Sequence, residues 1–257
     1  MNAESGCGIA IMAKASIPGR AKTRLVPPLT FAEAADFNTA FLLDVAANIA
    51  EGAGEAPIRG YVAFGPPETA AYFTSTLRSS IGLIEAWHAN FGDCLFTAIA
   101  AMFDRGHSAA VVLNSDSLTL PTSLLVRTAR LLAGPGDRAV LGPSRDGGYY
   151  LLGLKTPHRR LFENVAWSTE QVAQQTSARA AEIGLPVYIL PEWYDVDDAL
   201  SLQLLQSELD GVAVIDRDLQ PHAAVHTAAL MRRLLAQTDL AARLELARAP
   251  SFQRAAE

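Results

Sequence analysis

Residues 109–121, AAVVLNSDSLTLP, decide the predicted fold. They begin with a short β-branched apolar run through Leu113, which is typical of a strand buried on both faces of a parallel sheet. The run ends in Asn114, Ser115 and Asp116. Ligands of open α/β sheets sit outside the carboxyl ends of the strands, so we expect Asp116 to point into that crevice, where a hard cation would be held. The alternative is that Asp116 only closes a turn or caps the following helix.

The segments on both sides of this strand alternate between strand and helix patterns. Expected strands span residues 8–13, 58–64, 82–86, 139–142, a segment ending at 154, and 186–190; expected helices span about 30–51, 68–77, 95–106, 121–134, 168–183 and 199–208, followed by 223–235 and 240–247. The first helix opens with a capping box, Thr30 with Glu33. Alternating strands and helices with short connections predict a three-layer α/β/α domain with a mostly parallel sheet.

Composition limits the class of protein. The chain has 257 residues, 50% hydrophobic and 19% charged, which suits one large α/β domain. The net charge of -6 argues against a general nucleic-acid or membrane-surface binder. Cys7 and Cys94 have no metal-ligand spacing, and no signal peptide or membrane span is recognised. We therefore expect a cytoplasmic protein without nucleic-acid or membrane partners.

A cationic loop follows the first expected strand. It places four cations within eleven residues, Lys14, Arg20, Lys22 and Arg24. The loop also contains Pro18 and Gly19, and its N–H groups and cations suit a polyphosphate. On the charges alone, a solvated charged loop is an equal alternative, and the Walker pattern GxxxxGK[ST] is absent.

Carboxylates gather after the last expected strand. Asp195, Asp197 and Asp198 occupy three of four positions, and they repel one another unless a cation or solvent separates them. One of Asp197 and Asp198 is expected to cap the helix at 199–208, which frees another carboxylate for a metal. Since Asp116 and this group both follow strands, they can meet at one edge of the sheet.

Two other segments have open alternatives. Asp146, Gly147 and Gly148 allow a tight turn and a close backbone approach to a ligand, or form only a hairpin turn. Asp93 contacts a ligand or caps the helix that begins near it.

In this combination and order, the chain resembles the DUF2064 family of transferase-like proteins. The matching pieces lie between residue 9 and about residue 205: Lys14 with 18–25, Ser115-Asp116 with Leu120-Pro121, 141–143 with 146–151, Trp167-Ser168-Thr169, and Asp195-Val196-Asp197. Residues 21–25 are also similar to a segment of the guanylyltransferase that activates phospholactate in coenzyme F420 synthesis. The resemblance implies the nucleotide-diphospho-sugar transferase fold, of GT-A and Rossmann-like type, for residues 1–210, with residues 211–257 as a helical extension packed on the same domain.

The resemblance also implies a site. The nucleotide would contact Lys14, Pro18, Gly19, Arg20, Lys22, Arg24, Asp93 and Ser115. Mg²⁺ or Mn²⁺ would be held by Asp116 and by Asp195 or Asp197, and the catalytic residues would be Asp116, Lys22 and Arg24. The acceptor would contact Asp146, Gly147, Gly148, Tyr149, Trp167, Ser168 and Thr169. These residues follow later strands, on the other side of the point where the strand order of such a sheet reverses.

These features predict a metal-dependent transferase that uses an activated nucleotide, because a divalent cation and Lys or Arg stabilise charge on departing phosphate oxygens. The dense cationic loop favours nucleotidyl transfer from a nucleoside triphosphate to a small phosphorylated acceptor. The Asp195-Val196-Asp197 spacing keeps a glycosyltransferase with a nucleotide-sugar donor open. Residues 91–94 replace a Leu-Gly-Glu-Arg-like stretch of the family, which keeps a non-catalytic nucleotide-binding protein open. The missing GxGxxG argues against a dehydrogenase, and a homodimer is compatible with the sequence.

Overall fold

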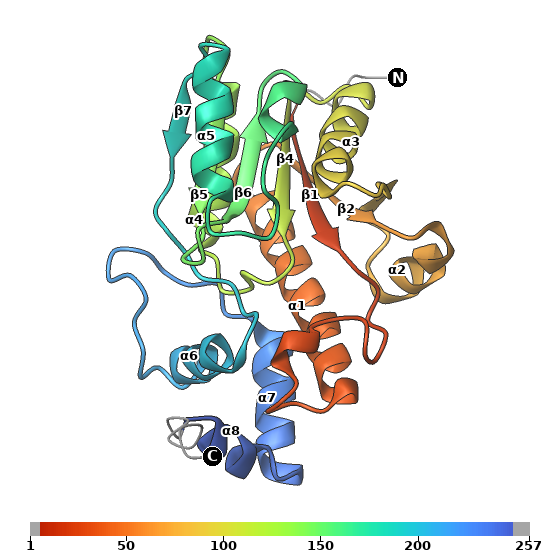
Figure 1. Ribbon diagram of the computed structural model, residues 1–257, viewed down its shortest axis with the longest axis vertical. Coiled ribbons are helices and arrows are strands. Elements are labelled where there is room, and N and C mark those ends of the chain that lie inside the picture. Colours follow the sequence, from red (N-terminus) through yellow and green to blue (C-terminus); the bar gives the residue numbers. More distant parts are fainter. Residues whose placement is uncertain (1–5, 249–257) are drawn as a thin grey trace, which may run out of the picture.

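The computed structural model describes residues 6–248 and is built on a seven-stranded sheet in the order β3-β2-β1-β4-β6-β5-β7 (Figure 1). The strands are β1 (Cys7–Ala13), β2 (Ile58–Phe64), β3 (Gly82–Glu85), β4 (Ala109–Asn114), β5 (Ala139–Pro143), β6 (Tyr149–Leu154) and β7 (Val187–Ile189). Among these strands β6 pairs antiparallel with both of its neighbours, and the other pairings are parallel. The predicted mostly parallel sheet is confirmed.

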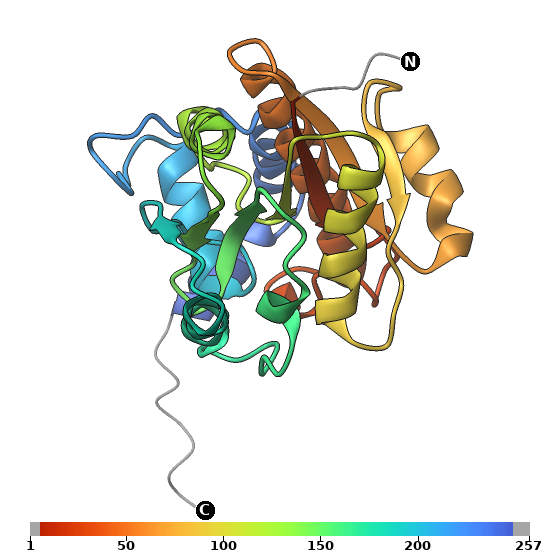
Figure 2. The ribbon, with the colours of Figure 1, turned by 90° about the horizontal axis from the view of Figure 1, so that it is seen from above.

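Residues 6–248 form eight α-helices. They are α1 (Phe31–Gly52), α2 (Ala70–Thr76), α3 (Phe91–Asp104), α4 (Thr122–Ala133), α5 (Val172–Glu182), α6 (Ala199–Leu209), α7 (Val225–Gln237) and α8 (Leu240–Arg248), with short 3-10 turns η1 (Thr23–Leu25), η2 (Pro67–Thr69) and η3 (Arg159–Phe162). Helices α1 and α4 cover one face of the sheet and α3 and α5 cover the other (Figure 2), which confirms the three-layer prediction. No helix in the described part of the chain is both long and apolar enough to cross a bilayer.

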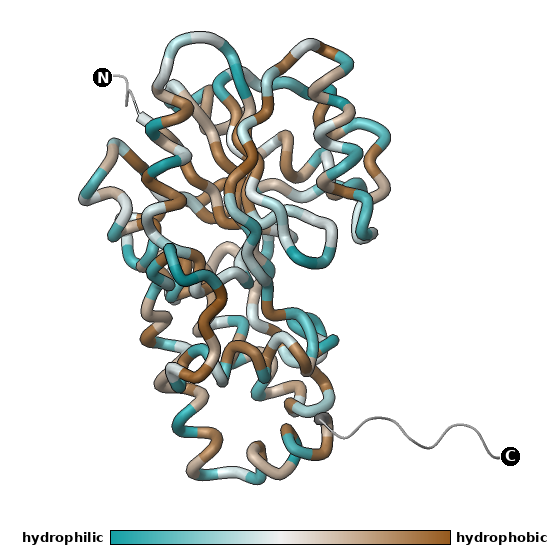
Figure 3. The backbone as a smooth tube through the Cα atoms, turned by 90° about the vertical axis from the view of Figure 1, so that its left-hand side faces the viewer, coloured by the Kyte–Doolittle hydropathy of each residue, from teal (hydrophilic) through white to brown (hydrophobic). Residues whose placement is uncertain are grey.

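The central strand β4 is buried on both faces, as its apolar run predicts. Val111 and Leu113 pack into the core beneath α1 and α4, whereas Ala110 and Val112 pack into the core beneath α3 and α5. Alternate residues of a strand point to opposite faces, so a strand between two helical layers needs apolar residues at every position. The tube in Figure 3 accordingly shows hydrophobic colour through the centre of the sheet.

The helix starts follow local sequence in two cases and depart from it in one. The capping box of α1 is present, with Glu33 N donating to Thr30 Oγ1 at 3.2 Å and Thr30 N donating to Glu33 Oε2 at 2.7 Å. Asp198 caps α6 by accepting from Ser201 N at 2.8 Å. The expected start of a helix at 168–170 is wrong, because α5 begins at Val172. Ser168 has a φ of 64°, a left-handed conformation that a helix cannot contain.

The C-terminal helices are tied to α1 by two polar contacts. Asp44 of α1 is fully buried and accepts from His226 N and Thr227 N at 2.9 and 2.8 Å, at the start of α7. Glu33 receives two hydrogen bonds from Arg243 of α8, at 2.7 and 2.8 Å. Helix α7 therefore packs against α1, and α8 packs against α6 and α7 and reaches α1 through Arg243. Residues 249–257 of the predicted extension lie outside the described residues.

Candidate active site

Four parallel strands end together and form one edge of the sheet. Met12 pairs with Asn114, Ala13 pairs with Phe64, and Phe64 pairs with Glu85, so β1, β2, β3 and β4 leave the sheet at the same level. A cavity of about 560 Å³ opens at this edge. The end of β2, the segment after β3 and the first turn of α3 supply an apolar and aromatic part of its lining: Phe64, Gly65, Ala86, Trp87, Phe91 and Cys94. The cationic loop after β1 and the polar end of β4 supply the other part: Lys14, Arg20, Lys22, Arg24, Asn114, Ser115 and Asp116.

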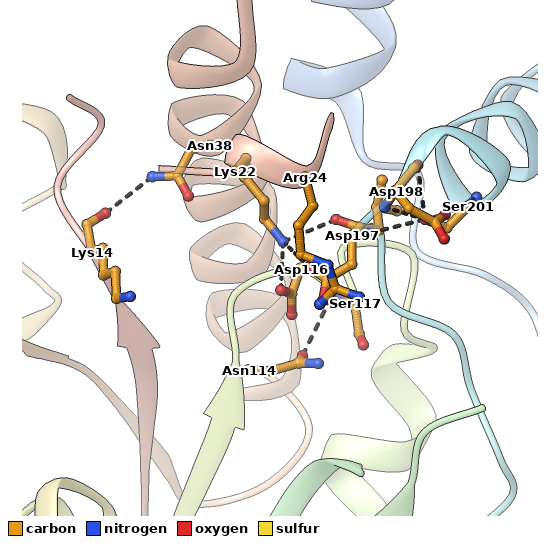
Figure 4. A network of polar contacts seen from close by, with 11 residues as sticks. Lys14, Lys22, Arg24, Asn38, Asn114, Asp116, Ser117, Asp197, Asp198 and Ser201 are labelled. Carbon is orange, nitrogen blue, oxygen red and sulfur yellow. Dashed lines mark hydrogen bonds and ion pairs between the residues drawn. The ribbon is translucent and has the colours of Figure 1, made fainter. Parts of the chain in front are cut away.

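A side chain of helix α1 hydrogen-bonds to the first residues of the cationic loop. Asn38 Nδ2 donates to the Lys14 carbonyl oxygen at 3.0 Å (Figure 4). The same nitrogen donates to Ser16 Oγ at 2.9 Å. Ser16 Oγ also lies 2.7 Å from the Tyr72 hydroxyl, which anchors the loop to α2. The loop then turns through Gly19, whose φ is 76°. Asn38 was not predicted as a site residue, and the available signal was a polar amide among the apolar positions of α1.

Lys22 lies at the centre of the polar network. Its Nζ donates to Asp116 Oδ2 at 2.5 Å, to Asp197 Oδ1 at 2.8 Å and to the Val196 carbonyl oxygen at 2.9 Å (Figure 4). The side chain of Lys22 is 8% exposed, against 18% for Asp116 and 33% for Asp197. Arg24 Nη1 reaches Asp197 Oδ2 at 3.4 Å. The fold therefore brings Asp116 and Asp197 together at one edge, with a lysine between them.

Burial and charge act in opposite directions on these groups. Burial lowers the pKa of Lys22, but the carboxylates of Asp116 and Asp197 outweigh it and hold the pKa above its ordinary value. Burial raises the pKa of Asp116 more than Lys22 lowers it, whereas for the less buried Asp197 the attraction of Lys22 prevails and the pKa is lowered. Burial and then the charges of Asp116, Asp146 and Asp197 raise the pKa of Asp195 to about 7. Burial and mutual repulsion thus disfavour the charged forms of Asp116 and Asp195, whereas Asp197 keeps its charge beside Lys22 and Arg24.

The donor chemistry of the cluster suits a divalent cation, although its present arrangement does not form a metal cage. Within residues 6–248, no three side chains of the His, Cys, Asp and Glu types are grouped so as to hold a metal. The Lys22 ammonium lies where a cation shared by Asp116 and Asp197 would lie. Asp116 Oδ1 is buried and has no hydrogen-bond partner. One or two carboxylates with substrate phosphates are enough for Mg²⁺.

Most of the predicted nucleotide contacts reach the cavity. Its lining includes Lys14, Arg20, Lys22, Arg24, Ser115, Asp116, Ser168 and Asp197, whereas Pro18, Gly19 and Asp93 are not among the lining residues. Asp93 pairs with Arg159 at 2.7 Å, and both side chains are exposed. The alternative in which Asp93 caps its helix is wrong, because the Asn90 side chain accepts from Gly92 N and caps α3.

A second cavity of about 300 Å³ adjoins the first, since Arg24 and Asp197 line both. The other lining residues include Arg145, Asp146, Tyr194, Asp195 and Asp198. Of the predicted acceptor contacts, Asp146 lines this second cavity and Ser168 lines the first. Gly147, Gly148, Tyr149, Trp167 and Thr169 are not among the lining residues of either cavity.

Two of those predicted acceptor residues, Gly147 and Trp167, pack against other parts of the chain. Gly147 has a φ of 86°, and a Cβ there would lie 2.1 Å from the Glu170 carbonyl oxygen, so the close backbone approach at this glycine is to another part of the chain. The Trp167 ring packs edge-on against Phe91, with centroids 5.5 Å apart. The acceptor role of these residues stays a prediction.

Two aromatic side chains at the cavity were not predicted. Trp87 and Phe91 are 53% and 50% exposed and line the part formed after β3. The Trp87 ring packs on Gly65, where a Cβ would lie 2.6 Å from its Cε3 atom. An exposed indole fixed on one side by backbone presents a flat surface for stacking a ring. The sequence signal was an aromatic residue directly after the third strand.

The chain matches a family profile over residues 48–169, that of DUF2064, "Uncharacterized protein conserved in bacteria". The predicted family resemblance is confirmed for this segment, while the cationic loop and residues 195–197 lie outside it. No curated protein sequence matches the chain.

Three of the solved structures that are similar to this chain have informative descriptions. A protein from Desulfovibrio desulfuricans G20, provisionally described as a nucleotide-diphospho-sugar transferase, is 24% identical with a TM-score of 0.77, over 94% of this chain and 98% of that one. A CMP:2-keto-3-deoxy-manno-octonic acid synthetase complexed with CTP is 12% identical with a TM-score of 0.51, over 81% and 100%. A cytidylyltransferase from Leptospira borgpetersenii serovar Hardjo-bovis (strain JB197) is 10% identical with a TM-score of 0.51, over 92% and 96%. The predicted nucleotide-diphospho-sugar transferase fold is confirmed.

Proposed function

We propose that this protein is a metal-dependent nucleotidyltransferase that transfers a nucleotidyl group from a nucleoside triphosphate to a small phosphorylated acceptor. One observation carries the proposal: a single cavity joins an aromatic lining, Trp87 and Phe91, to a cationic lining on the loop after β1. A nucleotide has the matching two parts, a flat base and a polyanionic phosphate chain. The described CTP complex of a protein with this fold supports a nucleotide in such a cavity.

Each part of the site has a role in this reaction. Trp87 stacks the base, and Lys14, Arg20 and Lys22 bind the phosphates. Asp116 and Asp197, with Asp195 nearby, would hold Mg²⁺ or Mn²⁺, which supplies positive charge to the phosphate oxygens when bound. The acceptor lies in the second cavity, where Arg24 and Arg145 bind its phosphate.

The chemistry needs positioning and charge stabilisation more than proton transfer. An oxygen of the acceptor phosphate forms a bond to the α-phosphorus, the bond from that phosphorus to the bridging oxygen breaks, and pyrophosphate leaves. A phosphate monoester is largely ionised at neutral pH, so its oxygen attacks without a general base. Lys22 and Arg24 stabilise the charge that develops on the departing oxygens.

Product analysis tests the proposal. The protein is incubated with each of the four labelled nucleoside triphosphates, or with nucleotide-sugars, together with Mg²⁺ and a pool of small phosphorylated metabolites. Pyrophosphate release with label in a new diphosphate-linked product supports nucleotidyl transfer. Release of a nucleoside diphosphate from a nucleotide-sugar contradicts it in favour of glycosyl transfer. Nucleotide binding without any turnover in the presence of the pool favours the non-catalytic alternative.

A further inference from the structure

The hydrogen-bonding capacity of Lys22 is fully used by the groups that would hold a cation. Its three donors go to Asp116, Asp197 and the Val196 carbonyl oxygen, at 2.5 to 2.9 Å. The ring of Phe41 lies below the ammonium, 5.7 Å from centroid to Nζ. The lysine therefore takes the position of a metal between two carboxylates and supplies one positive charge there.

The backbone at this residue is unusual for a lysine. Lys22 has a φ of 49° and a ψ of 39°, and it immediately precedes the short turn η1. Few residues other than glycine adopt this left-handed conformation, and it persists only where surrounding contacts hold it. The three hydrogen bonds of the ammonium help to hold it, together with the hydrogen bond that the Lys22 carbonyl oxygen accepts from Leu25 N at 3.0 Å. Loss of the three ammonium bonds would remove most of these constraints.

Other cations line the same cavity as the Lys22 side chain. Lys22 lines the cavity together with Lys14 and Arg20, whose exposed cations have no ion-pair partner among the described residues. A polyphosphate bound to those two cations lies within the cavity that Lys22 also lines, and it offers the ammonium new acceptors. Moving Lys22 to the phosphates exposes Asp116 and Asp197, and Asp116 Oδ1 already lacks a partner.

We propose that Lys22 is an internal counter-ion that excludes free divalent cations from Asp116 and Asp197 until a polyphosphate draws its ammonium away. The metal and the nucleoside triphosphate then bind together, because each removes an obstacle to the other. This inference rests on the proposed function and adds a coupling between its metal-binding and nucleotide-binding steps. Each of the two states pairs its buried charges: lysine with carboxylates before binding, lysine with phosphate and metal with carboxylates after it.

The test measures Mn²⁺ binding in the absence of nucleotide. Binding is monitored as the loss of the free-ion signal in electron paramagnetic resonance. Lys22→Met is expected to bind Mn²⁺ about tenfold or more tightly than the unaltered protein, because it removes the cation that competes for both carboxylates. Lys22→Arg keeps that charge and is expected to show no such gain. Lys14→Met is the matched control, since it removes one lysine from the same cavity without touching a carboxylate. Adding Asp116→Asn to Lys22→Met is expected to abolish the gain.

The inference is overturned if Lys22→Met unfolds cooperatively yet binds Mn²⁺ no more tightly, or if Lys14→Met gains equally. Lys22→Gln, which retains a neutral donor between the carboxylates, replaces Lys22→Met if that variant does not fold, with the same gain expected. Calorimetric titration of the unaltered protein with each nucleoside triphosphate and Mg²⁺ is run separately. Nucleotide binding without the Mn²⁺ gain refutes the counter-ion role alone, whereas absence of nucleotide binding refutes the proposed function.

Discussion

Replacing Glu33 by glutamine (E33Q) is expected to remove a pH-dependent part of the stability of this protein. The Glu33 side chain is 11% exposed and receives two hydrogen bonds from Arg243, as well as one from Thr30 N. The pKa of Glu33 is lowered from 4.5 to about 2, and the hydrogen bonds from Arg243 are the largest cause. The carboxylate is therefore favoured in the folded protein, where it joins the start of α1 to α8.

The magnitude follows from that difference in pKa. A shift from 4.5 to about 2, or about 2.5 pKa units at 1.36 kcal/mol each, corresponds to about 3 kcal/mol of folding free energy. Because the folded pKa lies below the unfolded one, the unfolded chain binds more protons at low pH. The stabilisation is complete above about pH 4.5 and is lost as the pH falls toward about 2.

Urea unfolding followed by circular dichroism measures this effect. At neutral pH, E33Q is expected to be less stable than the unaltered protein by up to about 3 kcal/mol, and the difference is expected to shrink between about pH 4.5 and about pH 2. Glu68→Gln, at an exposed position in η2, is the control and should keep the original pH dependence. An E33Q protein that loses stability with acid as steeply as the unaltered protein would refute the linkage to this carboxylate.

Three other predictions concern the cavity and the helix ends. Trp87→Ala should weaken nucleotide binding in calorimetric titration by about 1–3 kcal/mol, and Trp87→Phe should weaken it much less. Gly65→Ala should also weaken binding, because the new Cβ displaces the indole. Unchanged affinity in Trp87→Ala and Gly65→Ala would exclude stacking at Trp87. Asp198→Ala should lower the free energy of unfolding by about 1 kcal/mol, and Asp198→Asn should retain most of it, because the cap of α6 accepts a hydrogen bond that asparagine also accepts. Asp44→Ala should lower the free energy of unfolding, measured with urea, by about 2 kcal/mol, since the buried N–H of Thr227 and the part-buried N–H of His226 lose their acceptor. Equal stability would mean that water replaces the carboxylate.

Helix and strand positions could be predicted largely from local sequence. The capping box of Thr30 and Glu33 forms within four consecutive residues, and the run before Asn114 is apolar at each position, so both signals are readable without the fold. The start of α5 could not be predicted in this way. Trp167 packs against Phe91 of α3, and Ser168 next to it has a left-handed backbone, so contacts with a distant helix decide that the helix begins later.

By itself, the sequence determined the three-layer architecture and the residue types that follow the strands, because the burial pattern and the alternation of strands with helices can be read from local periodicity. Only the tertiary structure decided which of those residues touch. Lys22 lies 94 positions from Asp116 and 175 from Asp197, and no local pattern specifies that a loop lysine, rather than a metal, lies between them. The strand register brings the ends of β1 and β4 to one level, and desolvation then requires each buried charge there to find a partner.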